Sequence, residues 1–386
     1  MKKGLRILSL SFVILLTGCD AKIASTNQEY TGHFSDIQYS YLTNDDPSNT
    51  TPYNGNMSEG DPKPVVLSWK ASGIKKYIVK IYDNIGLTEP VFTYVTTKNK
   101  LEFYNGKLNT TYYWTVSDIK EKVTSQSLTF RVNSYVAGPR NLKVEGVENI
   151  RDIGGWGIYD ESNHTYSRYM KQGMLYRSGR FNEDKAESVN VTVSEDGIRE
   201  LKENLKIKTE IDLRRSSNNE IGSLTHSALG EDVNYYNFPM LYEGKNLLTF
   251  TGKSGKDTYT YDNPGMIKQV FEVLANRDSY PVVFHCSIGK DRTGCIAFLV
   301  EALMGFKEEY IYRDYMFTNF ANAGMCKLQE DVLNDGRYGY TLMNYTNGTN
   351  LRNKTYNYLK DEVGISQTTL DSVINILKEN QTDSTM

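Results

Sequence analysis

The chain of 386 residues is predicted to contain an α/β domain preceded by a smaller all-β domain. Residues 62–138 contain short runs of alternating polarity separated by Gly, Asn or Lys turns, which predicts an all-β unit. From residue 139 to 386, strand patterns alternate with helical patterns, which is typical of a central sheet flanked by helices. Ala137-Gly138-Pro139 breaks the chain between the two units.

The N-terminus indicates export. Lys2, Lys3 and Arg6 precede the apolar run 7–16, which is too short for the roughly 20 residues that cross a bilayer, so residues 1–18 are predicted to be a signal peptide. Leu16-Thr17-Gly18-Cys19 resembles the lipobox of bacterial lipoproteins. The resemblance implies that Cys19 is acylated and anchors an extracytoplasmic cell-envelope protein to a membrane that the chain does not cross. The alternative is an ordinary secretory signal that ends in cysteine.

Residues 19–61 carry many Ser, Thr, Asn, Asp and Gly and few aliphatic residues, which predicts a flexible tether. Six strands are expected next, at 65–69, 77–82, 91–96, 100–104, 111–116 and 127–132. Residues 108–114 resemble the tyrosine-corner segment of fibronectin type III domains, and Trp69 lies where such folds carry a core tryptophan. This resemblance implies an immunoglobulin-like sandwich over 62–138, which either binds protein or glycan or serves as a spacer.

In the α/β domain, helices are expected at 197–205, 266–275, 295–304, 307–320, 356–362 and 368–378. Gly305 stops the third of these, and Gly364 and Ser366 separate the last two as C-cap and N-cap. Alternating apolar residues from Leu205 to Leu213 predict a strand.

The most informative segment runs from Pro281 to Gly294, Pro-Val-Val-Phe-His-Cys-Ser-Ile-Gly-Lys-Asp-Arg-Thr-Gly. An apolar strand ends at His285, and an apolar helix follows the loop, so Cys286 is expected at a helix N-terminus. Unpaired backbone N–H groups and the helix dipole favour an anion there, and Arg292 adds a bidentate grip. The loop residues Ser287, Ile288, Gly289 and Lys290 are therefore predicted to bind phosphate together with Arg292. The same positive field favours the thiolate of Cys286.

This arrangement predicts nucleophilic phosphoryl transfer. The Cys286 thiolate attacks phosphorus, a phosphocysteine forms, and water hydrolyses it. Asp291 is the preferred general acid for the leaving oxygen. Thr293 is expected to donate a hydrogen bond to the departing sulfur, and His285 to orient the loop through the backbone. A cysteine beside an apolar strand is often only a small buried hydrophobe, but the surrounding residues favour the catalytic reading.

The run from His285 to Gly294 resembles the catalytic loop of cysteine-dependent protein tyrosine phosphatases, and specifically the bacterial tyrosine and lipid phosphatases with Lys-Asp-Arg in this loop. The segments 149–155, 176–179 and 211–220, and Asp314-Tyr315 with Asn319, fall where that family has similar segments. The resemblance covers about 140–380. It implies a cysteine-phosphatase fold, metal-free hydrolysis of phosphotyrosine, phosphoserine or phosphoinositide, and the loop aspartate as acid.

Several other charged residues are candidates for supporting the site. Asp212 is the rival acid, although a structural ion-pair network of Asp212, Arg214 and Glu220 at the sheet edge is favoured. Arg151 and Asp152 are expected to be architectural, with Asp152 available to hydrogen-bond a loop. Arg177 and Arg180 are expected at the surface, with substrate contact as the alternative.

Composition excludes several classes of function. The formal net charge of −3 does not suit general nucleic-acid binding. Four histidines without metal-ligand spacing predict no metal, and no nucleotide loop occurs, so no cofactor is expected. The three cysteines besides Cys19 imply no disulfide framework. The sequence thus predicts a protein tyrosine phosphatase. Its expected partner is a phosphotyrosyl protein or peptide, with phosphoinositide as a second choice. An adhesion lipoprotein with an inactive phosphatase-like domain is the alternative of another class.

Overall fold

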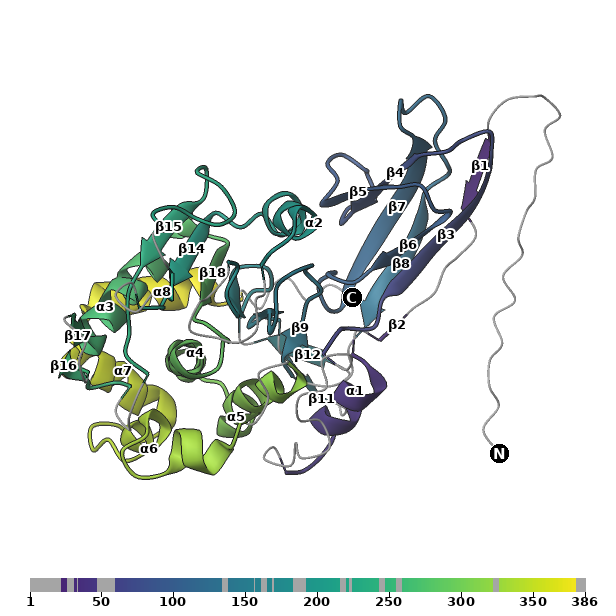
Figure 1. The fold of residues 1–386 in the computed structure, drawn as a ribbon. Coiled ribbons are helices and arrows are strands. Elements are labelled where there is room, and N and C mark those ends of the chain that lie inside the picture. Colours follow the sequence, from purple (N-terminus) through teal and green to yellow (C-terminus); the bar gives the residue numbers. More distant parts are fainter. Residues whose placement is uncertain are drawn as a thin grey trace, which may run out of the picture.

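The computed structural model describes residues 22–25, 31–32, 34–46, 60–133, 138–155, 157–160, 165–168, 170–182, 192–215, 220–221, 224–242, 247–254, 259–321 and 326–379. The predicted signal peptide 1–18 and Cys19 lie outside the described residues. Within these ranges, no helix is long and apolar enough to cross a membrane. Figure 1 shows a β-rich unit beside a helix-rich unit.

The β-rich unit consists of two sheets, with strand orders β2-β8-β7-β4-β5 and β1-β3-β6. Its strands are β1 (Lys22–Ser25), β2 (Thr31–Gly32), β3 (Val65–Ser72), β4 (Tyr77–Tyr82), β5 (Phe92–Thr96), β6 (Lys100–Phe103), β7 (Thr110–Asp118) and β8 (Leu128–Asn133). The Trp69 ring packs on Tyr77 and Trp114 at 5.2 and 6.3 Å between centroids. The six strands expected between 65 and 132 are all present, because their period-two patterns place one face of each in this core.

Three packed elements lie within the segment predicted to be a flexible tether, and one of them, β2, pairs in parallel with β8. β1 pairs antiparallel with β3, so that Lys22 lies opposite Ser72. α1 (Asp36–Leu42) begins at Ser35, whose hydroxyl accepts a hydrogen bond from the Gln38 N–H. The structure therefore differs from the predicted tether over 22–25, 31–32 and 34–46.

Helix α1 is held by the α/β unit. Tyr41 is fully buried against Phe317 and Phe320, with ring centroids 6.1 and 5.8 Å apart. The Arg313 guanidinium donates to the main-chain oxygen of Tyr41 at 2.9 Å and also to that of Asn44. Burial of these apolar side chains stabilises α1, and this is why residues 34–46 fold although most of their neighbours in the sequence are polar.

A six-stranded sheet of order β15-β14-β18-β13-β10-β9 forms the centre of the α/β unit. β13, β14, β15 and β18 pair in parallel, and β9 and β10 complete the sheet as antiparallel strands. Two hairpins, β11–β12 and β16–β17, lie outside it. The strands are β9 (Arg140–Asn141), β10 (Arg151–Asp152), β11 (Gly157–Asp160), β12 (Thr165–Arg168), β13 (Leu175–Ser178), β14 (Thr209–Asp212), β15 (Asn234–Asn237), β16 (Thr251–Lys253), β17 (Thr260–Asp262) and β18 (Val282–His285).

The helices of this unit are α2 (Glu195–Arg199), α3 (Asn263–Leu274), α4 (Asp291–Met304), α5 (Glu308–Phe317), α6 (Tyr338–Met343), α7 (Leu351–Asp361) and α8 (Gln367–Leu377). α4 is buried from Arg292 to Met304 and packs against α5 and α7. The predicted stop at Gly305 is confirmed by its φ of 84°, and the predicted N-cap by the Ser366 hydroxyl, which accepts from the Thr369 N–H at 3.0 Å. Short α6 was not predicted.

Buried polar contacts join the two units. The Gln172 side chain accepts from the Leu108 N–H at 2.6 Å and donates to the Leu108 oxygen at 3.0 Å. The Asn105 amide donates to the Glu200 carboxylate at 2.5 Å. Because these groups are paired with each other away from water, the β-rich unit is fixed on the α/β unit.

Asp152 belongs to this junction rather than to the catalytic loop. Its carboxylate pairs with Arg140 and accepts from the N–H groups of Gly154 and Gly173 at 2.9 and 2.8 Å. Neighbouring strand residues point to opposite faces, so Arg151 reaches the α4–α5 side of β10 while Asp152 does not. Asp152 therefore has the expected architectural role and hydrogen-bonds the turns at Gly154 and Gly173, whereas none of these contacts reaches the catalytic loop.

Candidate active site

The predicted catalytic loop lies at the carboxyl end of the parallel strands. β18 ends at His285, Cys286 follows, and α4 begins at Asp291 (Figure 1). Ser178 of β13 and Asp212 of β14 are in register with His285, so all three strands end side by side. Open α/β sheets place their binding sites at this edge. Cys286 is buried there, with 2% of its surface exposed.

Three side chains hold the loop by binding consecutive main-chain carbonyl oxygens. The contacts are Arg180 Nη1 to Ser287 O at 3.2 Å, Asn149 Nδ2 to Ile288 O at 3.0 Å and Arg177 Nη2 to Gly289 O at 2.7 Å. Because these carbonyl oxygens are directed out of the loop, its N–H groups can point inward. There they can bind an anion next to the N-terminus of α4.

Gly289 permits this course of the chain. Its φ is 74°, and a Cβ built there would lie 2.6 Å from the Ser178 main-chain oxygen. Only glycine avoids both the backbone strain and this clash. The sequence prediction that Gly289 belongs to a tight phosphate-binding turn is consistent with this geometry.

Arg177 and Arg180 were expected at the surface, and that expectation was wrong. They are 1% and 5% exposed, because β13 lies directly beside β18 and brings Arg177, within the strand, and Arg180, two residues after it, to the loop. Substrate contact, the alternative for these residues, is also not supported by the hydrogen bonds described here, since both guanidinium groups bind main-chain oxygens of the loop.

Asp314 on α5 is the centre of a buried network under the loop. Its carboxylate accepts from Arg151 Nε at 2.6 Å and from Arg177 Nη1. Arg151 also donates to the side chain of Asn149, which in turn holds the loop. Burial opposes ionisation of Asp314, but the charges of Arg151 and Arg177 lower its pKa. One carboxylate thus orients two arginines, and through them the loop.

The Glu220 carboxylate, expected in a network with Asp212 and Arg214, binds Arg292. Glu220 accepts from Nη1 and Nη2 of Arg292 at 2.8 and 3.1 Å. The predicted network of Asp212, Arg214 and Glu220 is therefore only partly present. Asp212 pairs with Arg214, whereas Glu220 meets Arg214 only through its main-chain oxygen. Glu220 was missed as a partner of Arg292.

Two donors at the start of α4 have no partner among the described residues: Arg292 Nε and the Thr293 hydroxyl. Both belong to fully or nearly fully buried residues. Burial acts to lower the pKa of Arg292, but the negative charges of Cys286 and Glu220 outweigh it, and the pKa is raised overall. The guanidinium therefore remains charged. Buried donors of this kind favour an incoming acceptor, which fits a phosphate bound beside Cys286.

The two candidate acids differ in their electrostatics. Burial and the nearby charge of Asp331 raise the pKa of Asp291, even though Lys290 and Arg292 act in the opposite direction. Burial also acts to raise the pKa of Asp212, but His285 and Arg214 bring it down to about 2. Asp212 is thus ionised at neutral pH and holds no proton to give. The comparison favours Asp291.

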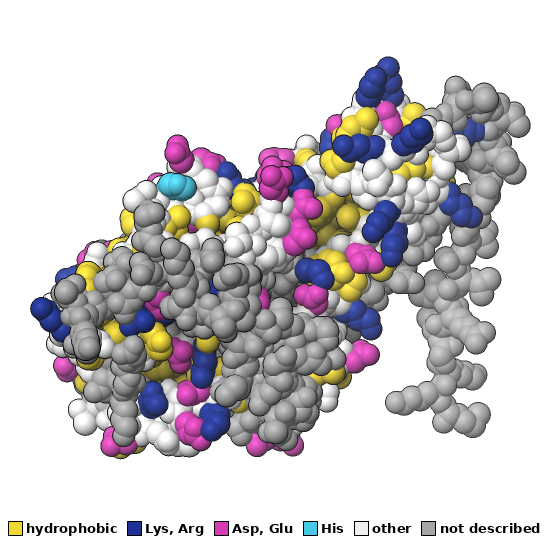
Figure 2. Space-filling view, in the orientation of Figure 1, with side chains coloured by type: hydrophobic (Ala, Val, Ile, Leu, Met, Phe, Trp, Pro, Cys, Tyr) yellow, Lys and Arg dark blue, Asp and Glu magenta, His cyan; other side chains and the backbone are white. Residues whose placement is uncertain are grey.

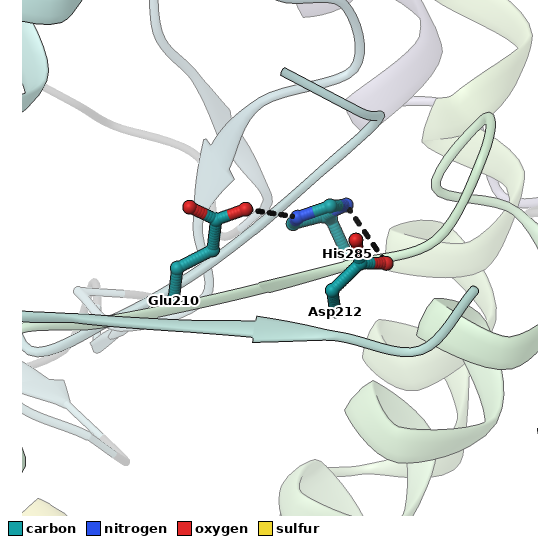
Figure 3. A group of neighbouring side chains, drawn as sticks. All are labelled: Glu210, Asp212 and His285. Carbon is teal, nitrogen blue, oxygen red and sulfur yellow. Dashed lines mark hydrogen bonds and ion pairs between the residues drawn. The ribbon is translucent and has the colours of Figure 1, made fainter. Parts of the chain in front are cut away.

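His285 lies between two carboxylates (Figure 3). Its Nε2 is 2.9 Å from Glu210 Oε1, and its Nδ1 is 3.2 Å from the main-chain oxygen of Cys286 and 3.9 Å from Asp212 Oδ1. This contact with the Cys286 backbone fits the predicted orienting role. The donor atoms of Glu210, Asp212 and His285 lie within 4.8 Å of one another, a spacing that would suit a metal ion.

The neighbours of this cluster disfavour a metal. The Arg214 guanidinium binds both oxygens of Asp212 at 2.6 and 2.9 Å, and the Ser227 hydroxyl donates to Glu210. Since both Asp212 oxygens already bind a positively charged guanidinium, the three residues are better understood as a hydrogen-bonded support for the loop.

Lys290, predicted to add positive charge at the mouth of the site, forms an ion pair with Asp331 at 3.1 Å. Tyr242 lies beside Arg292, with its ring centroid 4.9 Å from the Arg292 guanidinium and 5.3 Å from that of Arg215. The residue is 37% exposed. The sequence carried no signal for Tyr242, because only the fold brings the segment after β15 to α4.

Comparison with known proteins assigns a family. Residues 142–380 match the model of the tyrosine phosphatase family, so the chain belongs to that family. A provisionally named tyrosine-protein phosphatase of Cupriavidus necator is 24% identical over 200 residues, which cover 49% of this chain and 66% of that protein. A tyrosine-protein phosphatase of Nostoc commune is 36% identical over 69 residues, covering 18% and 24%. The chain thus matches less than two thirds of the length of either relative.

Two solved structures are also similar. The core catalytic domain of the PP-IP phosphatase SIW14 from S. cerevisiae, in complex with citrate, shows 18% identity and a TM-score of 0.27, over 42% of this chain and 82% of that one. TpbA from P. aeruginosa in complex with pTyr shows 17% identity and a TM-score of 0.26, over 46% and 83%.

Proposed function

We propose that this chain hydrolyses phosphomonoesters as a cysteine-dependent protein tyrosine phosphatase. The observation that carries the proposal is the loop from Cys286 to Arg292, whose carbonyls are held outward while a buried cysteine and an arginine with one unpartnered N–H lie at a helix N-terminus. Membership of the tyrosine phosphatase family supports it.

The reaction proceeds in two steps. In the first, the Cys286 thiolate attacks phosphorus, the S–P bond forms, the ester P–O bond breaks, and Asp291 gives its proton to the leaving oxygen. Arg292 and the loop N–H groups bind the equatorial oxygens as charge builds on them. In the second, water attacks phosphorus, Asp291 takes its proton, and the S–P bond breaks with the Thr293 hydroxyl hydrogen-bonded to sulfur. Phosphate and the free thiolate result.

The surroundings favour an aryl phosphate over a phosphoinositide. Tyr242, partly exposed and with its ring against Arg292, supplies an aromatic side chain beside which the ring of phosphotyrosine can pack. Lys290, which a polyphosphorylated headgroup would need, is already paired with Asp331. Phosphoinositide or dual-specificity hydrolysis remains the second candidate, and relative kcat/KM on a phosphotyrosyl peptide, a phosphoseryl peptide and phosphoinositide vesicles distinguishes them.

The alternative of another class is an adhesion lipoprotein with an inactive phosphatase-like domain. The presence of Asp291, Arg292 and Thr293 around Cys286 disfavours it. Complete absence of aryl phosphate turnover by the reduced, folded wild-type protein would favour it instead.

Asp291→Asn should slow esters with a poor leaving group by on the order of 10²–10⁴ and esters with a good leaving group much less, because only the former need the proton. Asp291 can act as the acid only while it is protonated, and burial raises its pKa above the ordinary value of a carboxyl group. Wild-type kcat on the poor leaving group should therefore be high in the mildly acidic range and fall as pH rises through that pKa. The variant should lack this fall. Steady-state rates on two aryl phosphates across pH measure both effects.

Asp212→Asn is the matched comparison for this experiment. Asp212 pairs with Arg214 and lies 3.9 Å from His285, which contacts the Cys286 backbone, so its replacement should slow both esters alike. The opposite pattern, with leaving-group dependence in Asp212→Asn and none in Asp291→Asn, would transfer the acid role to Asp212.

Two features outside the site complete the proposal. The Lys107 N–H donates to the Tyr112 hydroxyl at 2.7 Å, a contact of the tyrosine-corner kind that supports a fibronectin III-like class for residues 62–138. The lipobox-like segment ending at Cys19 supports an acylated, membrane-anchored cell-envelope protein. Mass spectrometry of the mature N-terminus tests the second, and an unmodified Cys19 would contradict it.

A further inference from the structure

Three turns meet at one end of the β-rich unit. Tyr77 is opposite both Thr96 and Asp118, so the turns that follow β5 and β7 lie beside the start of β4. The Trp69 N–H donates to the Asn99 oxygen at 3.1 Å, which ties the β5–β6 turn to β3. β1 begins at the same end, because Lys22 lies opposite Ser72.

Seven exposed lysines gather here, and we refer to them together as the lysine end. They are Lys22, Lys70, Lys75, Lys76, Lys98, Lys120 and Lys122. None of their ammonium groups is within ion-pair distance of a carboxylate of the residues that the structure describes. Figure 2 shows dark blue side chains on this end of the molecule.

The acidic groups at this end are few and engaged. The Asp118 carboxylate accepts from the N–H groups of Lys120 and Val123, and Glu121 pairs with Lys80 at 2.6 Å. At the opposite end, the 83–91 turn contains Asp83 and Glu89 and no lysine or arginine, and the 104–109 turn contains one lysine, Lys107. Positive charge is therefore concentrated at one end of the unit. Ile119, 45% exposed, adds an apolar side chain to that end.

The position of the lysine end, close in sequence to Cys19, indicates which surface it contacts. Cys19, the predicted acylation site, lies three residues before Lys22, and three residues span at most about 11 Å. An acyl chain on Cys19 would therefore bring the lysine end to the lipid surface without a long tether. Lysines close to an anionic membrane strengthen binding, and one lipid signal combined with a basic patch gives stable attachment.

We propose that the lysine end binds the anionic headgroups of the membrane that carries the Cys19 anchor. Ile119 then enters the headgroup region, and the β-rich unit, fixed on the α/β unit by buried contacts, holds the catalytic loop at a set distance from the lipid. This inference rests on the proposed acylation of Cys19 for its location. It does not depend on phosphatase activity.

The test uses the mature chain from residue 19 onward with Cys19→Ser, so that neither an acyl chain nor the apolar signal segment contributes. Binding to vesicles of phosphatidylcholine alone and of phosphatidylcholine with phosphatidylglycerol is measured by co-sedimentation at low and high salt. The wild-type surface should bind only the anionic vesicles, and less at high salt. Each lysine close to the surface contributes about fivefold in affinity, so K120E/K122E and K75E/K76E should each weaken binding by more than about 20-fold.

K206E/K208E is the matched control, since it makes the same charge change on two exposed lysines of the α/β unit. It should bind like the unaltered surface, and all variants should keep their aryl phosphate turnover. Equal loss in the control, or no preference of the wild type for anionic vesicles, overturns the proposal. Binding to a soluble sulfated polysaccharide without vesicle binding also overturns it, in favour of a glycan partner.

Discussion

Cys286→Ser should lower kcat for aryl phosphate hydrolysis by a factor on the order of 10⁵, while inorganic phosphate still binds. A serine hydroxyl at this position is not ionised at neutral pH and supplies almost no nucleophile. The carbonyl contacts of Asn149, Arg177 and Arg180 do not involve the sulfur, so the phosphate cradle should survive. Steady-state kinetics and phosphate titration by calorimetry measure the two effects.

Cys295→Ala is the matched control for this experiment. Cys295 is fully buried on α4, and burial raises the pKa of its thiol, so it is unreactive at neutral pH. Its replacement should leave kcat within a few-fold of the wild type. Substantial turnover by Cys286→Ser, or loss of activity in the control alone, would contradict the assignment of the nucleophile.

Asp314→Asn should lower the free energy of unfolding by about 3–5 kcal/mol, because it leaves two buried guanidinium groups without their carboxylate. Arg151 and Arg177 are both at most 1% exposed, so water cannot replace the lost partner. Since these arginines hold Asn149 and Gly289, the surviving folded enzyme should also lose phosphate affinity. Urea unfolding followed by circular dichroism measures the first effect.

Asp371→Asn provides the comparison for stability. Its carboxylate accepts a partly buried hydrogen bond from the Tyr356 hydroxyl at 3.0 Å and an exposed one from the Gln367 amide at 3.5 Å, so the change should cost within about 0.5 kcal/mol. If the two variants unfold at the same urea concentration, Asp314 is not the buried hub described above.

The local parts of the site were predictable. Cys286, Asp291, Arg292 and Thr293 lie within one strand–loop–helix segment, so their neighbourhood follows from sequence spacing. The six strands of the β-rich unit also followed, since each carries its own alternation of buried and exposed residues. Gly305 and Ser366 were found as caps for the same reason: a helix end is decided by a few adjacent residues.

The supporting residues were not predictable from spacing. Glu220 meets Arg292 across 72 residues, and Arg177 meets Gly289 across 112. These contacts depend on which strands are neighbours in the sheet, and periodicity does not encode strand order. Charged residues are mostly exposed, so a surface position was the default for Arg177, whereas buried pairing with Asp314 determined its place.

For the segment 19–61 the error was the opposite one: residues expected to be exposed in a tether are buried. The polar composition of this segment predicted a tether, but Phe34 lies just before the Ser35 N-cap of α1, and Tyr41 and Leu42 lie in the last turn of that helix, where all three are buried. Tyr41 meets Arg313 across 272 residues, a contact that no local pattern indicates.

The most direct test of the mechanism is to trap the covalent intermediate. Asp291→Asn, mixed with an aryl phosphate that has a good leaving group and quenched in acid within the first turnover, should carry one phosphoryl group. Peptide mass spectrometry should place it on Cys286, and Cys286→Ser should carry none. A phosphoryl group on another residue, or turnover of substrate with no phosphorylated peptide, would contradict the account.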